Sequence, residues 1–226
     1  MNIDVDITNA VLGAKGSGKS VLLAHFLTES NKKHILLDIL GVYNPKNDFK
    51  TAVVPHSYYC INVDAFIKTY SKFPIDAKII IDMSEYSQDD LVPATDALCS
   101  FLMDNKIKCG FMSDEVADIM PQMGRGSIQL HRMIKNGRNY GIRPVTIATQ
   151  RPQSVNKSIF DLCDKFLVSV QRAPRTVDYI ADILDTGGDE NIKTEIKQLK
   201  QREFLIYNGE SIKKWTVPVY KYAFNQ

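Results

Sequence analysis

The sequence lacks several features that mark whole classes of proteins. No apolar stretch approaches the roughly 20 uncharged residues that a membrane-spanning helix needs. The four cysteines form no C-x-x-C pair, and all but Cys163 lie in or beside apolar runs, which argues against a zinc site or a disulfide framework. The N-terminal segment has no basic region followed by an apolar one, as a secretory signal does. These absences predict a cytoplasmic protein with reduced thiols and no membrane partner.

Acidic residues are also missing from one long segment. Between Ile119 and Phe160 there is no Asp or Glu, while seven Lys and Arg residues occur there. The whole chain has a formal charge of only +2, so its remainder is net acidic. A positive segment in an otherwise acidic domain indicates either a surface that meets phosphate groups or a solvated face.

The composition as a whole is close to that of an average globular domain. The chain has 226 residues, of which 44% are hydrophobic and 24% charged, with only 12 glycines and 9 prolines. These values argue against disorder, collagen-like repeats and coiled-coil rods. The length suits one domain with a substantial core.

Apolar runs of strand length alternate with stretches at helical spacing. Helical spacing occurs from Lys19 to Glu29 and from Asp90 to Met103. The predicted strands are Thr8 to Leu12, Ile35 to Ile39, Tyr58 to Val63, Lys78 to Met83, Ile107 to Ser113, Pro144 to Thr149 and Lys165 to Gln171. Several are continuously apolar, as strands buried on both faces are. The pattern predicts an α/β fold with a mostly parallel central sheet flanked by helices.

The pattern changes after Arg175. Two helical stretches are followed by two short strands around Asn208-Gly209, a dipeptide typical of a hairpin turn. The stretches are Val177 to Leu184, Glu190 to Leu199, Phe204 to Tyr207 and Lys214 to Tyr222. We expect residues 1–175 to form the core and residues 176–226 a small helix and β-hairpin extension packed on it, in a single domain.

A phosphate-binding motif follows the first predicted strand. Residues 13–20 match G-x-x-x-x-G-K-[ST] and open a predicted amphipathic helix. Glycines let successive backbone N–H groups point at phosphate oxygens, and the helix N-terminus adds positive partial charge. Lys19 is expected to reach the β- and γ-phosphates, and the Ser20 hydroxyl to bind Mg²⁺. The predicted nucleotide-binding residues are Gly13, Ala14, Lys15, Gly16, Ser17, Gly18, Lys19, Ser20 and Val21.

Two isolated aspartates compete for the acidic role at this site. Asp38 and Gly41 match the D-x-x-G pattern by which GTPases sense the γ-phosphate, but the chain has no N-K-x-D motif for guanine. Asp82 ends an apolar strand, as a magnesium-binding Walker B aspartate does. Met83 and Ser84 follow it, however, and neither can polarise water. Asp82 remains an alternative for the metal alone.

The adjacent pair Asp114-Glu115 supplies both roles that phosphoryl transfer to water requires. It closes the predicted strand Ile107 to Ser113. Asp114 would bind Mg²⁺ together with Ser20, and Glu115 would orient and deprotonate the attacking water. Gly110 and Ser113 make this strand less apolar than a typical Walker B strand.

An amide side chain ends the next predicted strand. The strand Pro144 to Thr149 runs into Gln150, at the carboxyl edge of the sheet, where ligands of open α/β sheets bind. Gln150 is therefore expected to contact the γ-phosphate or the attacking water and to sense hydrolysis.

Together these motifs resemble the HerA/FtsK superfamily of DNA-pumping ATPases. The segments that carry the resemblance are Gly13 to Ser20, His34 to Asp38, Asp114-Glu115, Gly137 to Gly141 and Ala148 to Pro152. The resemblance implies a RecA-like (ASCE) P-loop fold in which an extra strand lies between the P-loop strand and the Walker B strand. It also implies a hexameric homo-oligomeric ring with double-stranded DNA in its pore.

In such rings an arginine from the neighbouring subunit usually completes the site. Arg138, between Gly137 and Gly141, is the first candidate for this catalytic role, and Arg151 and Arg172 are the alternatives. Arg132, Lys135 and Arg138 recur every third residue, opposite an apolar face, and would form a basic flank that contacts DNA phosphates regardless of sequence.

Within the superfamily the chain looks minimal, since it begins almost at the P-loop. Its size is similar to that of the genome-packaging ATPases of viruses with double-jelly-roll capsids. We therefore expect an ATP-driven, Mg²⁺-dependent translocase of double-stranded DNA that packages a viral genome, acts in the host cytoplasm or on the virion, and docks on capsid or portal-vertex proteins. The alternatives are a plasmid or repair motor of the same superfamily, a P-loop GTPase or small-molecule kinase, and a nucleotide-dependent scaffold that pumps no DNA.

Overall fold

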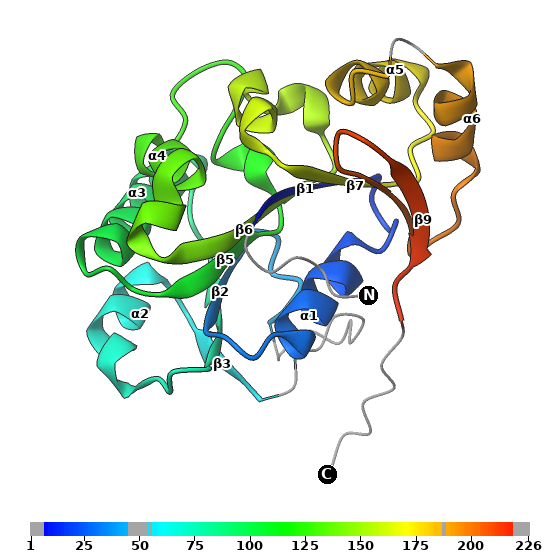
Figure 1. Cartoon of the computed structure of the whole chain (residues 1–226). Helices are drawn as coiled ribbons and strands as arrows, with labels where there is room; N and C mark the ends of the chain where they lie inside the picture. The colour runs from blue at the N-terminus through cyan, green and yellow to red at the C-terminus, as the bar shows by residue number, and fades with distance from the viewer. Residues whose placement is uncertain (1–6, 45–53, 55, 187–188, 219–226) are drawn as a thin grey trace.

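A nine-stranded sheet runs through the part of the chain that the computed structural model describes, residues 7–44, 54, 56–186 and 189–218 (Figure 1). Its strand order is β3-β4-β2-β5-β6-β1-β7-β8-β9. The strands are β1 (Thr8–Leu12), β2 (His34–Asp38), β3 (Ser57–Cys60), β4 (Lys78–Asp82), β5 (Cys109–Ser113), β6 (Ile142–Thr149), β7 (Lys165–Ser169), β8 (Glu203–Tyr207) and β9 (Ile212–Thr216). The helices are α1 (Lys19–Glu29), α2 (Val63–Thr69), α3 (Gln88–Asp104), α4 (Ile128–Asn136), α5 (Pro174–Ile183) and α6 (Glu190–Gln198).

The predicted α/β class and mostly parallel sheet are confirmed. Strands β1 to β7 all run parallel to one another, and β8 and β9 complete the edge as antiparallel strands. Strand β6 lies between the P-loop strand β1 and the strand β5 that precedes Asp114. This is the extra strand that the resemblance implied.

The predicted strand Tyr58 to Val63 is too long. Strand β3 ends at Cys60, and Val63 already begins α2. The side chain of Asn62 accepts a hydrogen bond from the backbone N–H of Ala65 at 2.8 Å, so it caps the new helix. A capping residue inside an apolar run thus decides where the strand stops.

Alternate residues of the strands feed two separate cores. On β2, Ile35 and Leu37 pack on one face of the sheet and Leu36 packs on the other. Helix α1 covers the face of Leu36, and helices α2, α3 and α4 cover the opposite face (Figure 1). A fully buried residue such as Leu37 stabilises the fold by about 1.5–3 kcal/mol, and truncating it to Ala costs about 2–5 kcal/mol.

The C-terminal hairpin continues the sheet. Strand β8 pairs with β7, Ser169 opposite Phe204, and β9 pairs with β8. Strand β9 ends at Thr216, earlier than the predicted Tyr222, and Tyr222 itself lies outside the described residues. In the described part of the chain, no helix combines the length and apolarity needed to cross a membrane.

Candidate nucleotide-binding site

The P-loop is anchored to the strands on both sides of β1. The backbone N–H of Gly13 donates to Thr149 O on β6 at 3.3 Å, and that of Ala14 donates to Val170 O, just after β7, at 3.0 Å. Gly16 and Gly18 have φ angles of 75° and 105°, a region that glycine enters without steric cost. The loop therefore curls into α1 in the way that a phosphate cradle requires.

Lys19 begins α1 and folds back over the loop. Its Nζ donates to Gly13 O at 2.8 Å and to Ala14 O at 3.1 Å. Burial lowers the pKa of Lys19 to about 8, although the carboxylates of Glu115 and Asp114 oppose the shift. The side chain is thus a buried cation close to both predicted acids, as a group that binds phosphate oxygens should be.

Glu115 follows β5, and a single strand, β6, lies between β5 and the P-loop strand β1. Its side chain is completely buried. Thr149 Oγ1 donates to Glu115 Oε1 at 2.5 Å, and the backbone N–H of Gln150 donates to Oε2 at 3.1 Å. Because Thr149 also accepts from Gly13, a single residue joins the carboxylate to the P-loop. Each carboxylate oxygen keeps a lone pair that can accept from water.

Asp114 forms a buried acidic pair with Asp38. The oxygens of Asp114 accept from the N–H groups of Ile39 at 2.8 Å and Leu40 at 3.3 Å. Burial raises the pKa of Asp114, and the neighbouring charge of Asp38 raises it further. Burial likewise raises the pKa of Asp38 to about 6. Two carboxyl groups are therefore held together where only one can ionise easily.

Tyr43 connects this acidic pair to the start of α1. Its hydroxyl donates to Ser20 O at 3.1 Å, and its backbone N–H donates to Asp38 at 2.8 Å. Burial, Asp114 and Asp38 raise the pKa of Tyr43. Tyr43 therefore links the first turn of α1 to the acidic pair of Asp38 and Asp114.

These groups suit a magnesium ion bound with a nucleotide. Carboxylate and hydroxyl oxygens are the ligands that Mg²⁺ prefers, and it usually takes one or two carboxylates and completes its shell with phosphates and water. Asp114 and Ser20 supply such a set, and a cation would relieve the repulsion between Asp114 and Asp38. Within the described residues no cluster of three or more His, Cys, Asp or Glu side chains could hold a metal without a nucleotide.

The isolated aspartates have structural partners instead. Asp82 accepts from Ser84 N at 2.9 Å, Ser84 Oγ at 2.7 Å and Asn44 Nδ2 at 3.3 Å, and also from Tyr59 OH. Its strand β4 is separated from β1 by β2, β5 and β6. Asp38 caps the loop after β2 through Val42 and Tyr43. Both β2 and β4 lie farther from β1 in the sheet than β5, the strand that precedes Asp114.

The candidate arginines lie in different places. Arg138 is exposed in a 3₁₀ turn (Gly137–Tyr140) that follows α4, so it is not on the helix that carries Arg132 and Lys135. The turn leads into the amino end of β6, whereas the P-loop contacts its carboxyl end. Eight residues of extended strand separate the two ends, about 23 Å. Arg138 therefore cannot reach the P-loop of its own chain.

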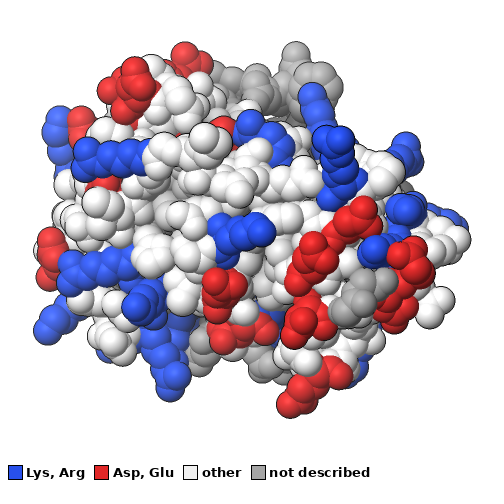
Figure 2. All heavy atoms as spheres, turned by 90° about the horizontal axis from the view of Figure 1, so that it is seen from above, with Lys and Arg blue, Asp and Glu red and all other residues white. Residues whose placement is uncertain are grey.

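Arg151 pairs with a carboxylate of its own chain. Its guanidinium lies 2.5 Å from Asp118 Oδ1, and the ion pair is half exposed on the arginine side. Arg172 is exposed just after β7. Seen from above, basic and acidic side chains are interspersed over the surface, with one group of acidic side chains at the lower right of the view (Figure 2).

The remaining predicted contacts lie on the loop and the first turn of α1. Lys15 and Gly16 are exposed, Ser17 is buried, and Val21 is half-buried. The structure thus brings together the P-loop, Asp114, Glu115 and the half-buried Gln150, and leaves Arg138 and Asp82 apart. Sequence reasoning missed Thr149, which holds Glu115, although its position directly before Gln150 was a usable signal.

Comparisons with known proteins support this reading of the fold. No family model matches the chain, and no curated protein matches it by sequence. The genome packaging NTPase B204 from Sulfolobus turreted icosahedral virus 2 superposes with a TM-score of 0.68 at 18% identity, over 95% of this chain and 98% of that one. The chain has the fold of the FtsK-like P-loop ATPases. In another structure of the same protein the ligand is AMPPCP.

Two further solved structures have the same architecture. VirB4 of Thermoanaerobacter pseudethanolicus superposes with a TM-score of 0.64 at 11% identity, over 95% of this chain and 90% of that one. The bacterial conjugative coupling protein TrwBdeltaN70 gives a TM-score of 0.66 at 12% identity, over 97% and 86% of the two chains. The predicted RecA-like P-loop fold is confirmed.

Proposed function

We propose that the protein is an ATP-driven motor for double-stranded DNA, most similar to viral genome-packaging ATPases. The observation that carries the proposal is the position of Glu115, which Thr149 and Gln150 hold one strand from the P-loop, inside the charge cluster of Lys19 and Asp114. This arrangement combines a phosphate cradle, a metal ligand and a general base. The near full-length likeness to the B204 packaging NTPase supports it.

The chemistry assigned to the site is hydrolysis of the γ-phosphoryl group. The P-loop N–H groups and Lys19 would bind the phosphates, and Mg²⁺ held by Ser20 and Asp114 would neutralise charge on their oxygens. Water attacks the γ-phosphorus, the bond to the β–γ bridging oxygen breaks, and the water proton passes to Glu115. ADP leaves with the bridging oxygen, and the phosphate leaves separately.

Gln150 is proposed as the sensor of this step. Its backbone N–H donates to Glu115, and its half-buried side chain stands at the same edge of the sheet. Loss of the γ-phosphate would therefore change the contacts of Gln150 and shift the loop that follows β6.

Arg138 is proposed to act in a second copy of the chain. It stands at the amino end of β6, out of reach of its own P-loop, so a role in hydrolysis requires a neighbouring protomer. A hexameric ring satisfies this requirement, because each carboxyl edge then meets the Arg138 side of the next protomer.

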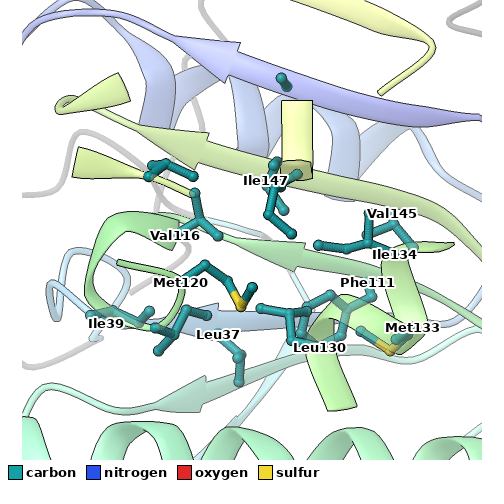
Figure 3. Packing of buried hydrophobic residues seen from close by; sticks show 14 of the residues in the cluster. Leu37, Ile39, Phe111, Val116, Met120, Leu130, Met133, Ile134, Val145 and Ile147 are labelled. Carbon is teal, nitrogen blue, oxygen red and sulfur yellow. The ribbon is translucent and has the colours of Figure 1, made fainter. Parts of the chain in front are cut away.

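The DNA-contacting surface is assigned to the exposed basic residues of α4 and the turn after it. Arg132 donates to Tyr140 OH at 2.7 Å, and Lys135 and Arg138 are exposed. Beneath them, Leu130, Met133 and Ile134 pack on the strand residues Phe111, Val145 and Ile147 (Figure 3). A rigid support of this kind lets a motor transmit movement of the sheet to phosphates.

A packaging role places the protein in the cytoplasm of a host cell, with capsid or portal-vertex proteins as docking partners. The D-x-x-G alternative has no support from the geometry, because Asp38 caps its own loop. A scaffold that binds ATP without pumping DNA is the competitor that an experiment must separate.

The decisive assay measures the ATPase rate with and without duplex DNA at 50 and 200 mM salt. We expect duplex to stimulate turnover, and the stimulation to fall steeply at the higher salt because phosphate contacts release counterions. The double variant Arg132→Ala, Lys135→Ala should retain basal turnover and lose stimulation, while Lys213→Ala, an exposed hairpin residue, should behave as wild type. Turnover that ignores duplex would favour the scaffold.

A further inference from the structure

Arg202 contacts the P-loop from the C-terminal part of the chain. Its backbone N–H donates to Ser17 O at 2.8 Å, and its carbonyl oxygen accepts from Val217 N at 2.9 Å. Ser169 strengthens the junction, since its hydroxyl donates to Glu203 O at 2.8 Å and lies 3.3 Å from Ser17 O. The start of β8 is thus fixed to the loop that would hold phosphates.

The side-chain stem of Arg202 covers Gly18. A Cβ atom placed on Gly18 would lie 2.8 Å from Cγ of Arg202, so the two residues are in direct contact. Gly18 precedes Lys19, where α1 begins and where backbone N–H groups face an anion. The guanidinium therefore extends from a point beside the phosphate-binding amides.

This guanidinium is not neutralised within the described part of the chain. The residue is half-buried, and among the described residues no ion pair or side-chain hydrogen bond involves its guanidinium. By contrast, Arg151 is paired with Asp118 and Lys193 with Asp178. A half-buried, unneutralised guanidinium beside an anion cradle is complementary to a phosphate oxygen.

The backbone of Arg202 is also strained. Its φ of 69° lies in the left-handed region, which costs a non-glycine residue about 1–2 kcal/mol. Glycine would occupy the position without this cost. Strained non-glycine residues persist where the surroundings fix them, and they cluster at ligand sites.

We infer that Arg202 is a second cationic ligand of the nucleotide, which contacts the phosphates nearer the ribose. The inference rests on the proposed function. In the sheet order, Glu115 approaches the P-loop from the β5 side and Arg202 from the β8 side, with β1 between them. The γ-phosphate must face Glu115, so a guanidinium on the other side meets the inner phosphates. The C-terminal hairpin is thereby part of the nucleotide site.

The test is the affinity of the variant Arg202→Gly for AMPPCP, ADP and adenosine, measured by calorimetry with Mg²⁺. Glycine removes the charge and relieves the strain, so the free protein should melt at the same or a higher temperature. AMPPCP and ADP should each bind about 10- to 100-fold more weakly, because a charge-assisted contact is lost, while adenosine binding should not change. Arg202→Asn, which tolerates a left-handed backbone, should show the same loss.

Lys213→Ala, on the same hairpin, removes one positive charge away from the loop and should bind as wild type. Wild-type affinity for ADP in both Arg202 variants would overturn the inference while leaving the proposed function intact. An equal loss for adenosine would also overturn it, because the contact would then be to the base or the ribose. A wild-type protein that binds neither AMPPCP nor ADP would instead overturn the proposed function.

Discussion

The two edges of the parallel sheet differ in their ionisable residues and in how those residues are partnered. Acidic residues stand where strands end, and basic residues stand where strands begin. At the carboxyl ends of β2, β4 and β5 are Asp38, Asp82, Asp114 and Glu115, and at the amino ends of β2, β4 and β7 are His34, Lys78 and Lys165.

Charges at the amino edge are relieved by the chain itself. Lys78 Nζ donates to Lys32 O, and Lys33 Nζ lies 3.3 Å from Tyr70 OH and 4.5 Å from the ring centroid. Burial lowers the pKa of His34 to about 4, so its ring is neutral at physiological pH. Lys33, His34 and Lys78 therefore need no ligand to offset their burial.

Groups at the carboxyl edge are hydrogen-bonded as well, but two of its carboxyl groups, Asp38 and Asp114, are held against each other. Burial raises the pKa of Asp38 and Asp114, and burial lowers that of Lys19. A nucleotide with its cation would satisfy all three groups at once. The difference shows that the site is marked by neighbouring buried groups with shifted pKa values, rather than by the density of charge alone.

The largest expected effect comes from Arg138, which stands at the amino edge but is proposed to act in hydrolysis at the carboxyl edge of a neighbouring protomer. Arg138→Ala should lower kcat for ATP by about 10³-fold, because an arginine finger stabilises charge on the transferred group. Its affinity for AMPPCP should stay near that of wild type, because an arginine finger stabilises charge that develops only in the transition state. Lys135→Ala, exposed on α4, is the matched control and should keep its basal turnover.

Mixing two variants tests whether Glu115 of one protomer and Arg138 of another form one catalytic site. An equimolar mixture of Arg138→Ala and Glu115→Gln should be more active than either variant alone, because some interfaces then combine an intact Glu115 with an intact Arg138. A mixture no more active than its components would place Arg138 outside the catalytic site.

Substitution of Gly110, at the amino edge, should change the stability of the fold and not its nucleotide affinity. A Cβ at Gly110 would collide with the buried imidazole of His34, so Gly110→Ala should destabilise the fold by about 1–3 kcal/mol. Chemical denaturation measures this loss, and AMPPCP affinity should not change. In a His34→Ala background the same substitution should cost less, because the colliding ring is gone. An unchanged cost would show that the strain has another source.

The carboxyl edge should respond to pH. Asp38 has a pKa of about 6 in the folded protein against 3.8 as its ordinary value. Its protonated form is therefore favoured by folding, and stability falls as pH rises through this window. Between pH 4.5 and 7.5, the Tm of the nucleotide-free wild type should therefore fall relative to that of Asp38→Asn. For a chain of this size, each kcal/mol of lost stability lowers Tm by about 2–4 °C. Thermal melts check this, with the exposed Asp104→Asn as control, and a constant difference would contradict it.

Local patterns predicted most of the fold and half of the site. Apolar runs gave the buried strands, and the P-loop, Asp114-Glu115 and Gln150 occur in the order that places them at one sheet edge. The contact between Thr149 and Glu115 and that between Arg202 and Ser17 could not be predicted, because residues 34 and 185 positions apart meet only through strand order. Helix α2 was missed because Asn62 ends an apolar run that read as one strand.

The most direct measurement compares nucleotide binding with hydrolysis in Glu115→Gln. The amide keeps the size of the side chain and its acceptor oxygen but cannot take a proton, so kcat should fall by about 10²- to 10⁴-fold while the Kd for ATP stays unchanged. Glu85→Gln, exposed beyond β4, should leave both quantities at wild-type values. Turnover retained in Glu115→Gln would contradict the account, because the carboxylate held against the P-loop would then not be the base.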